Sequence, residues 1–118
     1  MWGPVLLQMA LIFFFSAQPK GSPVLEGFPL PAGMGHFVGY LLLGVLLYRA
    51  FNKGLSGWSL RAGGHAFLTG FIYAISDELH QLFVPGRDCS VADIVIDGAA
   101  LVVAMVVIWV WNSRNLWR

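Results

Sequence analysis

The chain has 118 residues, one cysteine and a net charge of +1, and 58% of its residues are hydrophobic whereas only 11% are charged. Since an average soluble domain carries about 25% charged residues, this composition predicts an integral membrane protein and argues against a soluble one. There is no basic stripe, so no nucleic-acid partner is expected, and one cysteine excludes an intramolecular disulfide. The length fits a single domain over 1–118.

The first apolar segment, residues 2–17, is slightly shorter than the roughly 20 residues that span a bilayer. A cleaved signal peptide is the alternative, but such a peptide has basic residues before its apolar core and a small-residue cleavage site. The first basic residue is Lys20, which favours a retained helix. The prolines of segment 18–31 predict a loop after it.

The second apolar segment covers residues 34–51. His36 and Tyr40 are four residues apart and therefore share one helix face. Gly35 and Gly39 form a pair of small residues that allows another helix to approach closely. Arg49 and Lys53 close this segment, and residues 54–63 are expected to form a loop.

The third apolar segment, residues 64–84, has two distinct faces when its residues are placed 100° apart. Large apolar side chains occupy one face and predict a surface in contact with lipid: Leu68, Phe71, Ile72, Ile75, Leu79, Leu82 and Phe83. Small and polar residues occupy the other and predict a packed face: Gly70, Tyr73, Ala74, Asp77, His80 and Gln81, with Glu78 at its edge.

The fourth apolar segment, residues 91–111, follows Ser90, which with Asp93 resembles a helix capping box. Asp93 and Asp97 share one face, which continues through small alanines. Trp109 and Trp111 near its end are typical of a membrane interface.

Basic residues are concentrated in two places, the 49–61 region and the C-terminal tail. Because short cytoplasmic loops carry the excess of Lys and Arg, we expect four transmembrane helices with both termini in the cytoplasm. The predicted fold is an all-α membrane protein, a small antiparallel bundle with spans at about 2–17, 34–51, 64–84 and 91–111.

Five of the six acidic residues lie between Ser76 and Gly98. In the predicted topology they share the outer half of the membrane with His36, and ionisable residues within membrane segments indicate functional sites by default. We expect one outward-opening cavity between the second, third and fourth spans. Acid–base chemistry is assigned to Asp77, Glu78, His80 and Asp97, and substrate binding to Gln81, Arg87, His36, Tyr40 and Asp93.

Two other interpretations of these residues stay open. One is a structural polar network in which Arg87 and His80 neutralise two acids and Asp93 helps to cap its helix. The other is a divalent cation held by His80 with Asp77, Asp93 or Asp97, since imidazole and carboxylate are both metal ligands. Their spacing matches no established metal motif, so no cofactor is assigned.

At these residues the chain resembles the VanZ-like family of small bacterial membrane proteins. The resemblance rests on the run from Ser76 to Arg87, SDELHQLFVPGR, followed by Ser90-Val91, Asp93 and Asp97-Gly98. Phe15-Ser16-Ala17-Gln18-Pro19 is similar to the end of the family's first helix, and Gly35-His36-Phe37 with Tyr40 is similar to a second family segment. That segment usually carries a lysine where this chain has Gly35.

The resemblance implies a multi-span protein of the bacterial cytoplasmic membrane, in a family named after a member linked to teicoplanin resistance. Three functions are compatible with it. The first is binding or modification of a lipid-linked or cell-wall precursor at the outer leaflet. The second is a membrane hydrolase or transferase that uses acid–base or metal chemistry. The third is a non-catalytic partner that packs into a larger membrane complex.

Overall fold

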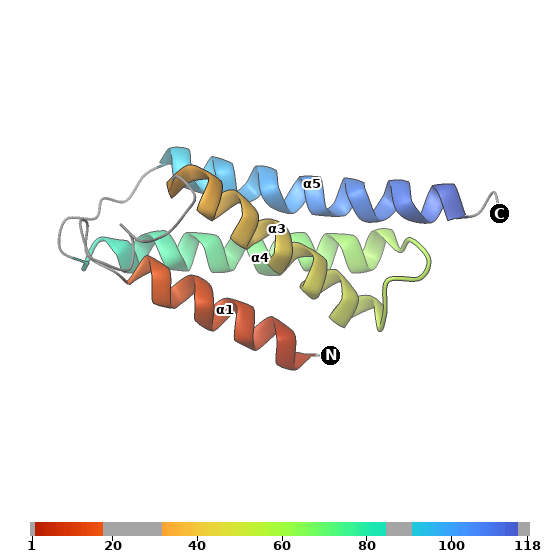
Figure 1. Cartoon of the computed structure of the whole chain (residues 1–118), viewed down its shortest axis with the longest axis horizontal. Helices are drawn as coiled ribbons and strands as arrows, with labels where there is room; N and C mark the ends of the chain where they lie inside the picture. The colour runs from red at the N-terminus through yellow and green to blue at the C-terminus, as the bar shows by residue number, and fades with distance from the viewer. Residues whose placement is uncertain (1, 18–31, 85–90, 116–118) are drawn as a thin grey trace.

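The computed structural model describes residues 2–17, 32–84 and 91–115, and within these ranges the protein consists of four α-helices and no strand. The helices are α1 (Trp2–Ser16), α3 (Ala32–Asn52), α4 (Leu60–Gln81) and α5 (Val91–Asn115). Successive helices run in opposite directions along one long axis, as Figure 1 shows. The prediction of an all-α bundle is therefore confirmed for the part of the chain that the structure describes.

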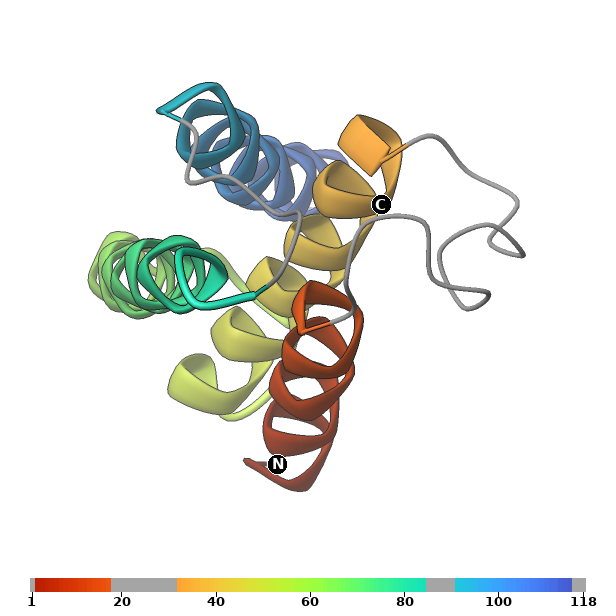
Figure 2. The same cartoon turned by 90° about the vertical axis from the view of Figure 1, so that its left-hand side faces the viewer.

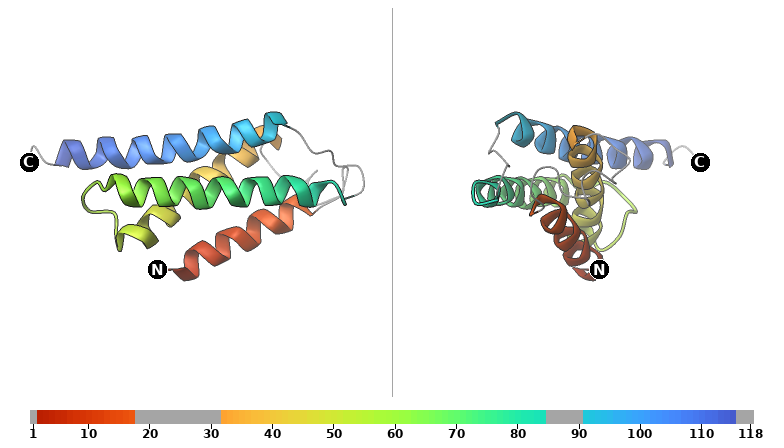
Figure 3. Two further views of the ribbon diagram at one scale, coloured as in Figure 1. Left: turned by 180° about the vertical axis from the view of Figure 1, so that it is seen from behind. Right: turned by 60° about the vertical axis from the view of Figure 1, so that its left-hand side comes forward.

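The central element of the bundle is α3. It contacts each of the other three helices, and α4 and α5 lie antiparallel to each other beside it. The end-on view in Figure 2 shows α3 between the α4–α5 pair and α1. Figure 3, seen from behind, shows that the first turn of α1 and the last turn of α5 lie towards the same end.

Close approach between helices depends on small residues. A Cβ atom placed on Gly44 of α3 would lie 2.9 Å from the Cβ of Ala104 in α5, and one on Gly70 of α4 would lie 2.6 Å from a Leu101 methyl group. The apolar core around these contacts includes fully buried Leu43, Leu47, Ala100 and Ala104. Helices that lack bulky side chains at their contact can pack backbone against backbone, as membrane helices commonly do.

The two-faced character predicted for the third segment is confirmed. On α4, the large apolar residues are exposed, with Phe71 partly buried, while Gly70, Ala74, Asp77 and Gln81 are buried. The other helices also expose large apolar side chains. In water such a surface would aggregate, so its extent indicates a lipid environment.

The start of α4 differs from the prediction of a loop up to Gly63. The helix begins at Leu60, because the Ser59 hydroxyl caps it by accepting a hydrogen bond from the Ala62 amide at 3.2 Å. Gly63 is tolerated in this first turn since the ring of Trp58 occupies the space of its missing side chain, 2.6 Å from where a Cβ would be.

Two helices are long and apolar enough to cross a membrane, Met34–Asn52 and Val91–Arg114. The 15 residues of α1 rise about 22 Å, less than the roughly 30 Å of a hydrocarbon core. With 22 residues, α4 is long enough, but Asp77, Glu78, His80 and Gln81 make its last turns polar. The described residues thus contain two clear candidate spans, and the four-span arrangement stays a prediction.

Candidate functional site

Three helices bring polar side chains together at one end of the bundle, where α3 and α5 begin and α4 ends (Figure 1). We call this group the polar site and define it by six residues. They are His36 and Tyr40 from α3, Asp77 and Glu78 from α4, and Asp93 and Asp97 from α5.

His36 is the residue that links the helices. Its Nδ1 lies 3.1 Å from Oδ1 of Asp97, and this pair joins α3 to α5. An ionised carboxylate only accepts hydrogen bonds, so the Nδ1–H of His36 donates to Asp97. The same imidazole lies near Glu78 and Asp93, since one ligand atom from each of the three residues lies within 4.8 Å of the others.

Tyr40, one turn after His36, extends the polar site to α4. Its hydroxyl donates to Oδ2 of Asp77 at 3.2 Å, and its ring is stacked on that of His36 with the two ring centroids 6.4 Å apart. The shared face predicted for His36 and Tyr40 therefore carries both side chains into one network.

The polar site is deeply buried. Glu78 and Asp97 are 0% exposed, Gln81 is 1% exposed and Asp77 is 3% exposed, while His36 and Asp93 are partly buried. Among the described residues, no hydrogen-bond partner is found for one oxygen of Asp77, one oxygen of Asp97 and the Nε2 of Gln81. Buried polar atoms are nearly always satisfied in folded proteins, so partners for these atoms are expected outside the described side chains.

Two predicted residues are arranged differently from the rest. His80 lies against α1, with its ring tilted on that of Phe13 at a centroid distance of 4.5 Å, and it is not part of the group around His36. Gln81 lies one turn beyond Asp77 on the same buried face of α4, and its side-chain amide is buried at the end of that helix.

Arg87 falls outside the described residues, as do Cys89 and Ser90. The prediction that the Arg87 guanidinium folds over the acids thus stays a prediction.

Sequence reasoning missed the contribution of α1. Ser16, in the last turn of that helix, is 4% exposed, and its hydroxyl lies near enough to the Asp77 carboxylate to stabilise its charged form. Phe13 of the same helix covers His80. The signal that could have identified Ser16 was its place in the family-like segment Phe15–Pro19.

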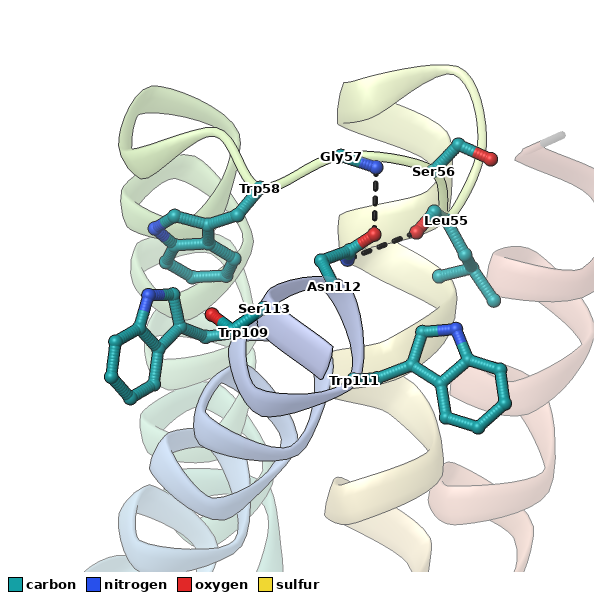
Figure 4. A pocket seen from close by; sticks show the side chains of 8 residues that line it. All are labelled: Leu55, Ser56, Gly57, Trp58, Trp109, Trp111, Asn112 and Ser113. Atoms are coloured by element: carbon teal, nitrogen blue, oxygen red, sulfur yellow. Dashed lines mark hydrogen bonds between the residues drawn. The ribbon is translucent and has the colours of Figure 1, made fainter. Parts of the chain in front are cut away.

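A hollow of about 600 Å³ lies at the opposite end of the bundle, between the loop after α3 and the end of α5 (Figure 4). Asn112 holds this loop, accepting from the Gly57 amide at 2.7 Å and donating to the Leu55 carbonyl at 3.1 Å. No titratable side chain is among the residues that line it: Leu55, Ser56, Gly57, Trp58, Trp109, Trp111, Asn112 and Ser113. The hollow therefore offers no acid–base chemistry, and its exposed tryptophans suit a membrane interface.

What the polar site can do chemically follows from its composition. It combines four carboxylates, an imidazole and a phenol within a buried setting, which are the groups used for proton transfer and for binding cations or hydrogen-bond donors.

Comparison with known proteins identifies the family. The family described as VanZ/LLP1 matches residues 1–112 of the 118-residue chain. No curated protein and no solved structure matches the chain. The family match covers all six residues of the polar site, and together with the two apolar helices it indicates a membrane protein. The chain belongs to the VanZ/LLP1 family.

Proposed function

We propose that this VanZ/LLP1 protein binds, and acts on, a lipid-linked or cell-wall precursor through the polar site, from the outer face of the bacterial cytoplasmic membrane. The observation that carries the proposal is the burial of four polar side chains where three helices meet. Glu78, Asp97, Gln81 and Asp77 are each at most 3% exposed. Ionisable groups at such depth in a membrane protein are costly, and they occur where a substrate or an ion needs them.

The distribution of charge supports an outward orientation for this site. Arg49 is in the last turn of α3, Arg61 follows the start of α4, and Arg114 is in the last turn of α5. All three are thus at the end of the bundle opposite the polar site (Figure 1). Basic residues next to membrane helices favour the cytoplasmic side, so the four-span arrangement with both termini inside directs the acids outward.

The exposed apolar surface supports a ligand with a lipid tail. Leu79 is exposed in the last turn of α4, and Leu82 and Phe83 are exposed directly after the helix, near the buried acids Asp77 and Glu78. An acyl or prenyl chain can lie along these side chains while its polar head reaches Asp77 and Glu78. Asp77 or Glu78 then serves as acid or base, and Gln81 and Tyr40 position the head group.

Lipid analysis of the purified protein tests the proposal. The protein is extracted directly into membrane nanodiscs, and the lipids that remain with it are compared with the bulk membrane by mass spectrometry. We expect enrichment of a lipid-linked envelope precursor with the wild type and its loss with Asp77→Asn, Glu78→Gln or Asp97→Asn. These changes keep side-chain shape but remove the ionisable group.

Ser113→Ala is a matched control, since Ser113 lies at the far hollow. If the wild type retains only bulk lipids, or if all three carboxamide variants retain the precursor, the proposal is wrong. In that case a non-catalytic role within a larger membrane complex is the function to pursue.

A further inference from the structure

We infer that His36, Glu78 and Asp93 form a binding site for one divalent metal ion within the polar site. The three residues come from α3, α4 and α5, and one ligand atom from each lies within 4.8 Å of the other two. The inference deepens the proposed function and rests on it for the role of the ion, although the binding of the ion does not depend on it.

The ligand set fits a first-row divalent cation. Carboxylate oxygens suit Mn²⁺ and Mg²⁺, imidazole suits Zn²⁺ and its neighbours, and a mixed set of one nitrogen and two oxygens suits Mn²⁺ or Zn²⁺. Metal–ligand bonds are about 2.1 Å long, and three atoms that lie within 4.8 Å of one another all lie within about 2.8 Å of a common centre. Atoms within 4.8 Å of one another therefore need to move by less than about 1 Å to close around it.

A second observation supports the site independently, and it concerns Asp97. This residue is 0% exposed, and its Oδ1 accepts the hydrogen bond from Nδ1 of His36 at 3.1 Å. In the neutral imidazole this bond leaves Nε2 as the ring nitrogen with a free lone pair, and we take Nε2 as the ligand atom. Histidines that bind metals nearly always donate their other ring N–H to a carboxylate or carbonyl, so Asp97 acts as a positioning residue.

The second oxygen of Asp97 is buried and has no hydrogen-bond partner among the described residues. A buried carboxylate with an unsatisfied oxygen is stabilised when a positive charge lies near it. The bond to His36 connects this carboxylate to the proposed ligand set, so a cation held by His36 would offset part of the cost of its burial.

The charge balance of the described residues points the same way. The polar site holds four carboxylates and one imidazole, while the described arginines of α3, α4 and α5 are at the other end of the bundle. One divalent cation offsets two of the negative charges and reduces the repulsion among the acids.

Manganese titration tests the inference without any substrate. The full chain, in lipid nanodiscs and freed of metal with a chelator, is titrated with Mn²⁺, and the electron paramagnetic resonance signal of free Mn²⁺ is followed. We expect one Mn²⁺ to bind per chain and Zn²⁺ to displace it. His36→Ala, Glu78→Gln and Asp93→Asn should each weaken binding at least tenfold, and Asp97→Asn by about 10- to 100-fold through loss of positioning.

The matched control is His65→Ala, since His65 is exposed in the first half of α4, with its ring tilted against that of Phe51. It should bind Mn²⁺ as the wild type does. The inference is overturned if the wild type leaves the Mn²⁺ signal unchanged, or if His65→Ala weakens binding as much as His36→Ala. The wild-type titration decides the matter even where a site variant fails to fold. Intact Mn²⁺ binding without retained envelope lipid would contradict the proposed function alone.

Discussion

At the scale of single residues, Asp77 has two different environments. One oxygen accepts the hydrogen bond of the Tyr40 hydroxyl at 3.2 Å, and the other is buried with no hydrogen-bond partner in the part of the chain that the structure describes. The hydrogen bond from Tyr40 fixes the Asp77 carboxylate relative to α3, because Tyr40 is itself buried, with 1% of its surface exposed. The Ser16 hydroxyl of α1 also lies near this carboxylate, so Asp77 connects α4 to α1 as well as to α3.

Removal of the Tyr40 hydroxyl should measure how much its hydrogen bond to Asp77 stabilises the fold. Tyr40→Phe leaves Oδ2 of Asp77 without its donor, and we expect a loss of about 1–3 kcal/mol in unfolding free energy. In an Asp77→Leu background the same change should cost much less, because no buried acceptor remains. Denaturant unfolding in lipid discs is measured for the wild type, Tyr40→Phe, Asp77→Leu and the double variant. The four unfolding free energies give the coupling energy between Tyr40 and Asp77. A Tyr40→Phe cost that is equal in the two backgrounds would mean that the bond contributes nothing.

At the scale of helices, the contact between α3 and α5 is set by backbone proximity. Gly44→Ala should lower the unfolding free energy by about 1–3 kcal/mol. Its new Cβ would lie 2.9 Å from the Cβ of Ala104, and neither atom is at the end of a flexible side chain. Gly64→Ala is the matched control, since nothing lies within 4 Å of its added Cβ. It should stabilise α4 by up to about 1 kcal/mol through helix propensity.

Thermal unfolding of both variants checks this prediction. If Gly44→Ala is as stable as Gly64→Ala, α3 and α5 do not approach as closely as described.

The helices also show how far sequence patterns predict this structure. The face of α4 that carries Asp77 and Gln81 was predictable from helical periodicity, since its buried positions recur every three to four residues along the chain. The start of α4 was not, because a loop rich in glycine concealed the Ser59 cap. The bond between His36 and Asp97 spans 61 residues of sequence. Periodicity shows that each residue lies on an inner face but does not indicate which helices meet.

The contribution of α1 was also beyond sequence reasoning. The Nε2 of Gln8 donates to the Gly39 carbonyl at 3.0 Å, and the Tyr73 hydroxyl donates to the Met9 carbonyl at 2.6 Å. Both bonds involve backbone acceptors, which every residue has, so no pattern of side chains predicts them. They place Phe13 and Ser16 beside the residues of α4.

At the scale of the whole molecule, the orientation of the bundle is open to a direct test with the chain's one cysteine. Cys89 should react with a membrane-impermeant maleimide in intact cells, because the proposed topology puts the segment between α4 and α5 outside. Ser56→Cys in a Cys89→Ser background is the matched control. Ser56 is exposed in the loop at the opposite end and should react only after lysis. The reverse pattern would invert the topology and direct the polar site towards the cytoplasm.

The central claim is that an envelope precursor binds at the polar site, and photo-crosslinking from the two ends of the bundle tests it most directly. A photoreactive amino acid replaces either Met34, which is 54% exposed and two residues before His36, or Leu55, which is 40% exposed at the far hollow. Membranes that contain each protein receive a lipid-linked cell-wall precursor radiolabelled in its sugar. We predict a labelled adduct from position 34, its loss when Asp97→Asn is added, and little adduct from position 55. Equal labelling from both positions, or labelling at 34 that persists with Asp97→Asn, would contradict the account.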